Sequence, residues 1–386
     1  MSRDTITILD TTLRDGEQSP GINLNLQDKV DIARILEQLK VDVIEAGFAA
    51  SSDGDFEAIK AVARTVKDST VCSLSRAVER DIERTAEAVR PAKSGRIHIV
   101  LSTSPVHMKY KLQQQPEAVL EQGVAAVKYA RKFGSDIEFS CEDASRSEFE
   151  FLKRMVEAVI KAGVTTISLP DTVGFSMPPE YGGLIGRLLN EVPNADKATF
   201  SAHCHDDLGL AVANSLAAVA AGARQVECTV NGIGERAGNA SLEEVVMAIK
   251  TRHDLLKVRT GVETRFLVPA SRLVAERTGF EVQRNKAIVG KNAFAHESGI
   301  HQDGMLKNPL TYQIMAPETV GGEDYQLVLG KHSGRAGYRS EMERLGVKFS
   351  SDAALSEAFR RFKKIADQKT HLDDRDLLAT VNSPTV

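Results

Sequence analysis

Short apolar runs alternate with longer amphipathic stretches from the first residues to about residue 255. The runs are rich in β-branched residues, which is typical of buried strands. They lie at residues 6–10, 41–47, 70–75, 96–104, 136–143, 165–172, 199–207 and 225–232. The pattern therefore predicts eight strands separated by helix-length segments.

The segments between the runs have the spacing of amphipathic helices. In residues 27–40, 116–132, 147–162 and 210–221 the sequence favours a helix, and in the first of them the apolar side chains recur on one helical face. Gly163 and Gly222 stand just before the next strands, where helix C-caps are expected.

The order of elements predicts an α/β fold in which eight parallel strands close into a (β/α)₈ (TIM) barrel. An open, doubly wound sheet is the rival. Its dinucleotide-binding fingerprint of three glycines is absent after the first strand, where Thr11, Thr12, Leu13 and Arg14 stand. The barrel is therefore the preferred interpretation.

The alternation stops near residue 255, and residues 263–386 are expected to be mostly helical. Their centre, residues 290–334, is loop-like and rich in Gly and His. We therefore expect a catalytic barrel in residues 1–262 and a helical C-terminal region in residues 263–386 that contributes active-site or lid residues.

Polar residues gather where the expected strands end. They are Arg14, Asp15, Glu45, His98, Glu142, Thr172, His205 and Asn231. In a (β/α)₈ barrel the carboxyl ends of the strands carry the active site. This placement predicts a catalytic centre at that face.

A metal site is the strongest chemical prediction. His203 and His205 are two residues apart on one expected strand and therefore point to the same side, while Cys204 points away. Asp15 follows the first strand, which neighbours the last strands in a closed barrel, and would complete a His₂-carboxylate set. Asn239 can approach directly or through water; the alternative is a hydrogen-bonded His pair without metal.

Other polar residues have both a functional and a structural interpretation. Arg14 suits a carboxylate or enolate oxygen, or else a salt bridge at the barrel rim. Thr172 suits a substrate carboxylate or a helix N-cap. Glu142 and Glu235 are candidates to transfer protons or to hold neighbouring site residues in place, or else form salt bridges at the barrel rim. His301, in a Gly-rich loop, is a candidate general acid or base with Tyr312 as its partner, or else holds the two regions together.

Composition narrows the classes of partner. The chain has 42% hydrophobic and 26% charged residues, a net charge of −4 and no long basic run, so no nucleic-acid surface is expected. No apolar run reaches the ~18–20 residues that span a bilayer, and no signal segment opens the sequence. The four cysteines form no paired motif, which indicates a reducing, cytoplasmic location.

Several ordered motifs carry a family resemblance. DTTLRDGEQSPG at 10–21, HCHDDLGLAVANSLAAV at 203–219 and NGIGERAGNASLEEV at 231–245 resemble the α-isopropylmalate and homocitrate synthase family. The resemblance continues through SCEDASRSE, HESGIHQDG and LGKHSGR and covers nearly the whole chain.

The resemblance implies a metal-dependent condensation of acetyl-CoA with a 2-oxo acid, followed by hydrolysis of the thioester. The motifs are most similar to bacterial members that convert 3-methyl-2-oxobutanoate into (2S)-2-isopropylmalate, the first committed step of leucine biosynthesis. Members that use pyruvate or 2-oxoglutarate are the nearest alternatives. Two further alternatives are a metal-dependent C–C lyase and a non-catalytic metal-binding protein. Neither explains the long C-terminal region and the retained polar residues as well as a synthase does.

The resemblance also implies roles for particular residues. It gives metal ligands (Asp15, His203, His205, Asn239), catalytic residues (Arg14, Glu142, His301, Tyr312), 2-oxo acid contacts (Arg14, His98, Ser140, Thr172) and acetyl-CoA contacts (Gly232, Gly234, Arg236). Mn²⁺ is the expected ion, with Mg²⁺ or Zn²⁺ as alternatives and K⁺ as a candidate activator. It further implies a homodimer in which His301 and Tyr312 reach the partner's barrel.

Two features depart from the family pattern. Asp206-Asp207 stands where Asn-Asp is usual, which leaves the identity of the metal open. The sequence ends at Val386, before the leucine-binding regulatory domain usual in the family, so the chain is expected to be insensitive to leucine.

Overall fold

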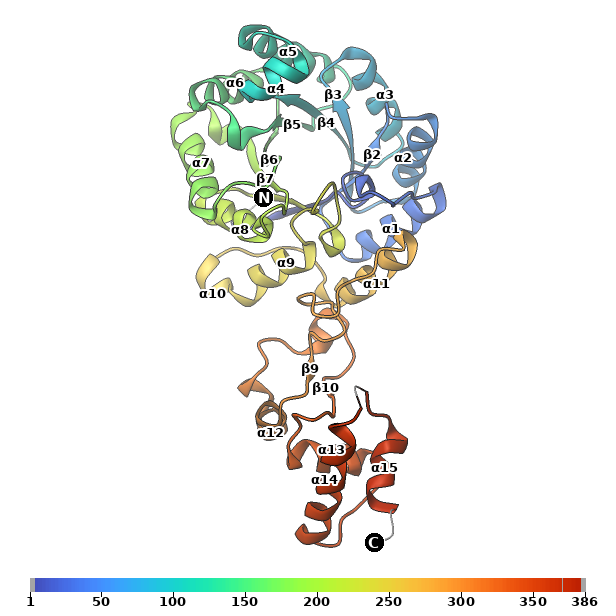
Figure 1. Ribbon diagram of the computed structural model, residues 1–386. Helices are drawn as coiled ribbons and strands as arrows, with labels where there is room; N and C mark the ends of the chain where they lie inside the picture. The colour runs from blue at the N-terminus through green and yellow to red at the C-terminus, as the bar shows by residue number, and fades with distance from the viewer. Residues whose placement is uncertain (1–3, 370, 383–386) are drawn as a thin grey trace. The chain divides into compact units, whose positions relative to one another are not determined.

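The computed structural model describes residues 4–369 and 371–382. It divides into two compact units, Met1–Val282 and Gln283–Val386, each described by itself below. The first unit is a closed barrel of eight parallel strands inside a ring of helices (Figure 1). The expected α/β barrel is therefore confirmed.

The strands follow one another around the barrel in the order of the sequence, and β1 closes it by pairing with both β2 and β8. Their bounds are β1 (Thr7–Asp10), β2 (Val43–Phe48), β3 (Thr70–Arg76), β4 (Gly95–Ser102), β5 (Ile137–Glu142), β6 (Thr166–Asp171), β7 (Thr199–Cys204) and β8 (Gln225–Cys228). Each strand begins within two residues of the start of the corresponding expected run.

The helices of the first unit connect successive strands or follow the last one. They are α1 (Leu26–Gln38), α2 (Asp53–Thr65), α3 (Glu79–Val89), α4 (Pro105–His107), α5 (Pro116–Ala130), α6 (Phe149–Ala162), α7 (Pro178–Glu191), α8 (Ala211–Ala221), α9 (Leu242–Thr251), α10 (His253–Leu256) and α11 (Leu267–Thr278). Short 3₁₀ turns, a π-helical turn at Met108–Leu112 and loops make up the remaining connections.

Local sequence explains where these helices begin and end. Asn25 caps α1 by accepting the backbone N–H of Asp28, whose carboxylate accepts the N–H of Asn25 in return. Helices α6 and α8 end at Gly163 and Gly222, which adopt left-handed φ angles of 119° and 120°. Both expected glycine caps are therefore confirmed.

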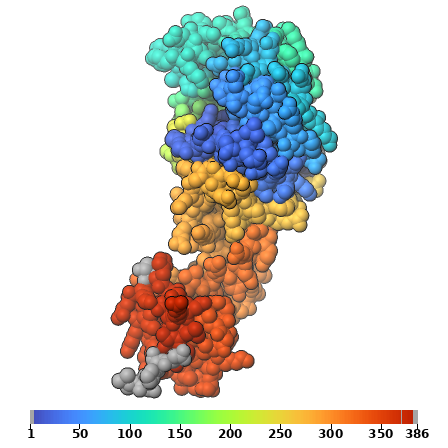
Figure 2. All heavy atoms as spheres, turned by 90° about the vertical axis from the view of Figure 1, so that its right-hand side faces the viewer, coloured from blue at the N-terminus to red at the C-terminus, as the bar shows by residue number. Residues whose placement is uncertain are grey.

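Helices α1, α2 and α3 lie side by side on the outside of the barrel and cover one side of it continuously (Figures 1 and 2). Helix α11 packs against α1, and Arg277 of α11 pairs with Asp31 of α1 at 3.2 Å. The expected division after residue 262 thus falls before α11, whereas the compact first unit extends through that helix to Val282.

The interior of the barrel holds charged side chains as well as apolar ones. Leu9, Val43 and Cys72 form a small apolar cluster. Elsewhere Arg96 of β4 donates to Glu138 of β5 and to the Gln225 side chain of β8, both at 2.9 Å. All three polar side chains are buried, so the barrel centre is held together by a hydrogen-bonded ionic network.

Two residues expected at strand ends lie inside the strands. Glu45 is in the middle of β2 and His98 is in the middle of β4, and both are buried. Their side chains point into the barrel, where His98 Nδ1 lies 2.6 Å from Glu45 Oε1. The strands continue past these residues because the following residues keep pairing laterally with β3 and β5.

The second unit has two short strands, β9 (Ala295–His296) and β10 (Gln326–Leu327), which pair in parallel. Its helices are α12 (Gly299–Lys307), α13 (Arg335–Arg344), α14 (Asp352–Ala366) and α15 (Asp374–Asn382). The last three helices surround an apolar core that includes Tyr338, Leu355, Phe362 and Leu377. A mostly helical C-terminal region is therefore confirmed.

Among the described residues, no helix is both long enough and apolar enough to cross a membrane.

Candidate metal centre

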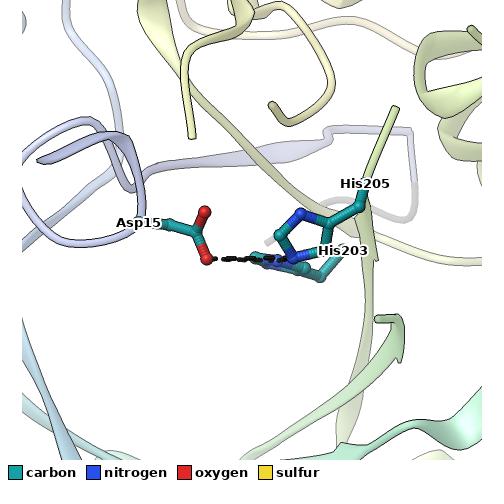
Figure 3. Close-up of side chains that lie close together, drawn as sticks. All are labelled: Asp15, His203 and His205. Carbon is teal, nitrogen blue, oxygen red and sulfur yellow. Dashed lines mark hydrogen bonds and ion pairs between the residues drawn. The ribbon is translucent and has the colours of Figure 1, made fainter. Parts of the chain in front are cut away.

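Three side chains from the ends of β1 and β7 converge at the barrel mouth. Asp15 Oδ2 lies 3.9 Å from the Nε2 atom of His203 and 3.9 Å from that of His205. The two Nε2 atoms lie 3.3 Å apart (Figure 3). All three side chains are buried, so their polar atoms face one another and not bulk water.

The two imidazoles have different surroundings. His203 Nδ1 lies 2.8 Å from Glu227 Oε2, and this carboxylate raises the pKa of His203 against the opposing effect of burial. Burial and the neighbouring His203 lower the pKa of His205 to about 4, which keeps the His205 ring neutral near pH 7. A neutral imidazole with an inward-facing Nε2 lone pair is the form that binds a metal.

Asn239 lies beside Asp15, at the edge of the group that Asp15 forms with the two histidines. Its Nδ2 donates to Asp15 Oδ1 at 2.6 Å and to the carbonyl of Ile233 at 3.2 Å. Its buried Oδ1 has no hydrogen-bond partner among the described residues. A buried acceptor in that state is costly unless something binds it. The amide oxygen is therefore available to a cation, directly or through water.

The donor set suits a divalent cation. Asp15, His203 and His205 offer one carboxylate oxygen and two imidazole nitrogens within 4.8 Å of one another, and Asn239 adds an oxygen beside them. Such a set leaves positions open for substrate. Two other buried groups have similar spacing, but their shared residue His98 is already hydrogen-bonded at both ring nitrogens.

Arg14 connects the metal centre to the barrel interior. Its Nη1 donates to Asp15 Oδ2 and its Nε donates to Glu45 Oε2, both at 2.7 Å. Burial raises the pKa of Asp15, but Arg14 and the two histidines outweigh it and lower the value to about 2. Burial also raises the pKa of Glu45, but Arg14 and His98 outweigh it and hold the value well below its usual range. Both carboxylates are therefore ionised, and the salt bridge considered for Arg14 is present.

His98 and Ser140, the expected 2-oxo acid contacts, bond to each other inside the barrel. His98 Nε2 lies 2.7 Å from Ser140 Oγ, and Glu45 occupies the other ring nitrogen. Burial would lower the pKa of His98, but Glu45 and neighbouring carboxylates raise it to about 8. The protonated His98 ring thus offsets the negative charge of Glu45 and the neighbouring carboxylates inside the barrel.

Glu142 and Thr172 lie at the ends of β5 and β6. The Glu142 carboxylate accepts Lys111 Nζ at 2.7 and 2.6 Å and the Ser102 hydroxyl. Thr172 Oγ1 accepts the backbone N–H of Asp143 at 2.9 Å. This contact links the loops after the two strands, and Lys111 is a further basic side chain close to the expected site.

The loop after β8 is fastened to its neighbours by Arg236. Its guanidinium donates to both carboxylate oxygens of Asp207, at 2.8 and 2.9 Å, and to the carbonyl of Thr172 at 2.7 Å. Gly232 and Gly234 precede it with positive φ angles. Asp206, the departure from the family pattern, turns one carboxylate oxygen toward the N–H of Ala211 at 2.9 Å.

The remaining expected residues are His301, Tyr312 and Glu235. In the second unit the His301 and Tyr312 rings stack with centroids 4.1 Å apart. Glu235 has an exposed side chain, while its backbone N–H points to Asp15 Oδ1 at 3.4 Å.

Sequence reasoning gave no role to Glu227, although a signal for it was present. Period-two alternation in β8 places Gln225 and Glu227 on the inner face, and the register of β7 with β8 sets Glu227 beside His203. Lys111 carried no such signal, because it reaches Glu142 from a π-helical turn.

The family models match both units. One described as HMGL-like matches residues 5–274, and one described as homocitrate synthase post-HMGL domain-like matches residues 288–370. A hydroxymethylglutaryl-CoA lyase from Pseudomonas aeruginosa has a TM-score of 0.63 and 20% identity over 72% of this chain and 95% of its own. An HMG-CoA lyase from Brucella melitensis has a TM-score of 0.60 and 19% identity over 72% and 99%. Fold and site thus define a barrel of the HMGL-like class.

Curated relatives define the family more narrowly. The 2-isopropylmalate synthase of Methylococcus capsulatus is 60% identical over 98% of this chain and 74% of its own length. That of Caulobacter vibrioides is 60% identical over 98% and 72%, and that of Dechloromonas aromatica is 58% identical over 99% and 74%. The chain belongs to the 2-isopropylmalate synthase family. The family membership indicated by the sequence motifs is therefore confirmed.

Proposed function

We propose that this chain catalyses the 2-isopropylmalate synthase reaction, in which acetyl-CoA and 3-methyl-2-oxobutanoate give (2S)-2-isopropylmalate and CoA. The observation that carries the proposal is the convergence of Asp15, His203 and His205 at the barrel mouth, in a chain 57–60% identical to curated synthases. Pyruvate- and 2-oxoglutarate-using synthases and a C–C lyase are less well supported, because high identity over nearly the whole chain is to 2-isopropylmalate synthases.

Asp15, His203, His205 and Asn239 would hold a divalent ion, with Mn²⁺ preferred to Mg²⁺ or Zn²⁺ and K⁺ as a candidate activator. When bound, the ion supplies Lewis-acid polarisation of the 2-oxo group. Asn239 supports this assignment through its unsatisfied buried oxygen. Asp15 supports it because its lowered pKa keeps it anionic.

Arg14 would stabilise negative charge as it develops on the 2-oxo oxygen. Its Nε and Nη1 groups already bond Glu45 and Asp15, so the guanidinium is fixed before substrate arrives. Preorganised donors of this kind stabilise a transition state without the cost of reorientation. The remaining Nη2 group is the one that would face substrate.

Glu142 and Thr172 would border the 2-oxo acid, with His98 and Ser140 beneath it. Lys111 supports a position for Glu142 next to an anionic substrate, since the ammonium group holds the carboxylate. His98 and Ser140 would act as the floor, because their polar atoms are bonded to each other and to Glu45.

Acetyl-CoA would lie against the loop that contains Gly232, Gly234 and Arg236. Arg236 already bonds Asp207 and Thr172. These bonds support a role in fixing the conformation of the loop at least as much as a direct contact of Arg236 with acetyl-CoA.

A homodimer would bring His301 and Tyr312 of a second copy to the barrel mouth. Large apolar side chains near these residues support an interface. They are Ile300, Leu310 and Ile314, with 77%, 82% and 80% of their surface exposed. A cytoplasmic location is supported by four cysteines that are all free and buried.

Thiol release from acetyl-CoA, measured against a panel of 2-oxo acids, tests the proposal. We expect fastest turnover with 3-methyl-2-oxobutanoate, loss of activity with chelator and recovery with Mn²⁺. Faster turnover with pyruvate or 2-oxoglutarate would overturn the substrate assignment. Full activity after metal removal, verified by elemental analysis, would overturn the role of the ion.

A further inference from the structure

Glu227 and His203 are lateral neighbours in the barrel. The register of β7 with β8 pairs the two residues, and both side chains point inward from adjacent parallel strands. His203 Nδ1 and Glu227 Oε2 lie 2.8 Å apart, and both side chains are buried. The contact is therefore built into the strand pairing and does not depend on a loop.

Glu227 is itself fixed in position. Its other oxygen, Oε1, accepts the hydroxyl groups of Ser168 at 2.5 Å and of Ser201 at 2.9 Å. These serines come from β6 and β7, so three strands determine where the carboxylate lies. The carboxylate has little freedom to rotate away from the His203 ring.

The chemistry of the pair determines the form of the imidazole. An ionised carboxylate only accepts hydrogen bonds, so the proton between the two residues belongs to His203 Nδ1. In the neutral ring the Nε2 atom then carries a lone pair. That atom is the one that faces Asp15 and His205.

His205 lacks an equivalent support. Its Nδ1 is buried and has no hydrogen-bond partner among the described residues. Its ring orientation is therefore set by packing and by the contact with His203. The two imidazoles of the candidate centre are unequal in how firmly they are held.

We propose that Glu227 is a positioning residue for the metal centre: it fixes the ring orientation and tautomer of His203 and makes His203 the stronger of the two imidazole ligands. The inference rests on the proposed metal site. A carboxylate that accepts from a ligating histidine typically strengthens metal binding by about 10–100-fold.

The test is the affinity of the folded protein for Mn²⁺, measured by electron paramagnetic resonance or calorimetry on the metal-free full chain. Glu227→Gln keeps an acceptor oxygen but loses the charge, and Glu227→Leu loses both. We expect the Mn²⁺ dissociation constant to rise about 10-fold in the first variant and about 100-fold in the second.

Glu138→Gln is the matched control, because Glu138 is another buried, inward-facing carboxylate but bonds Arg96 and Gln225. It should bind Mn²⁺ within about 2-fold of the unaltered protein. Thermal midpoints of the metal-free proteins separate a structural role from a positioning one, since lower stability alone would leave Mn²⁺ affinity unchanged.

Each outcome is decisive. An unchanged dissociation constant in Glu227→Gln, with tight binding by the unaltered protein, overturns the inference and leaves the proposed function intact. Equal weakening by Glu138→Gln also overturns it, since the effect would then be one of interior charge. Absence of Mn²⁺, Mg²⁺ and Zn²⁺ binding by the unaltered protein would overturn the metal site itself.

Discussion

The backbone at Gly234 passes so close to Asn239 that a Cβ atom at residue 234 would lie 2.1 Å from Asn239 Nδ2. The same atom would lie 2.8 Å from Asp15 Oδ1, and the φ angle of Gly234 is +156°. Glycine is required here by sterics and by backbone conformation together. Two residues of the candidate metal centre thus depend on the absence of a side chain at a third.

Gly234→Ala is therefore expected to displace Asn239 and Asp15. We predict at least a 100-fold loss of turnover and a clear loss of Mn²⁺ affinity, measured by thiol release and by metal titration. Gly183→Ala is the control, because a Cβ atom there meets nothing within 4 Å on an exposed turn of α7. That change should stabilise the helix by about 0.5–1 kcal/mol and leave turnover unaltered. Normal Mn²⁺ binding by Gly234→Ala would contradict the packing argument.

His205→Ala should remove a ligand and cost the fold only the packing of a buried ring, because His205 Nδ1 bonds no described residue. His203→Ala should remove a ligand and also leave Glu227 without its imidazole partner. Unfolding followed by circular dichroism is expected to show an extra destabilisation of about 1–3 kcal/mol for His203→Ala. Both variants should lose metal and activity; equal stability of the two would argue against the importance of the Glu227 contact.

Asp10 should make stability depend on pH. Burial raises the pKa of its carboxyl from 3.8 to about 7 in the folded protein, despite hydrogen bonds from Thr12. Between these two values the unfolded chain releases a proton that the folded chain keeps, so folding becomes less favourable as pH rises from about 4 to 7. Below that window the effect is absent, and above it the loss is complete.

Asp10→Asn removes this ionisation while its side-chain oxygen can still accept the N–H of Thr12. We expect the variant to gain stability over the unaltered protein between pH 5 and pH 8, by no more than about 3 kcal/mol, because the folded carboxyl stays protonated only up to about pH 7. Urea unfolding monitored by circular dichroism at both pH values measures the change; the chain has no tryptophan to serve as a fluorescence probe. A pH-independent difference would show that Asp10 is already ionised at pH 5.

Arg236 can act in one of two ways, by joining two loops or by contacting acetyl-CoA, and kinetics can distinguish them. If it acts by joining the loops through Asp207 and Thr172, Arg236→Lys and Asp207→Asn should impair turnover similarly, because lysine cannot form the three-contact arrangement. Their combination should then be little worse than either alone. If Arg236 instead contacts acetyl-CoA, Arg236→Lys should raise the KM for acetyl-CoA and Asp207→Asn should not. Steady-state kinetics of the three variants distinguishes the two.

The barrel could be predicted from sequence because alternating strands and helices with glycine caps leave few arrangements open. The convergence of Asp15, His203 and His205 followed from strand-end position and period-two spacing. The position of Glu45 and His98 inside their strands could not be predicted, because an apolar run in the sequence does not show where the pairing between neighbouring strands ends. The contacts of Arg236 could not be predicted, since they join loops 29 and 64 residues apart along the chain.

The ionic network in the barrel interior has a consequence for how this sequence can diverge. Arg96, Glu138 and Gln225 come from three separate strands and satisfy one another out of reach of water. Loss of any one leaves a buried polar group uncompensated, which costs far more than the exchange of one apolar side chain for another. Substitutions at these positions should therefore arise as compensated sets, so that among homologues the three positions would covary as a unit while the helices outside the barrel drift independently.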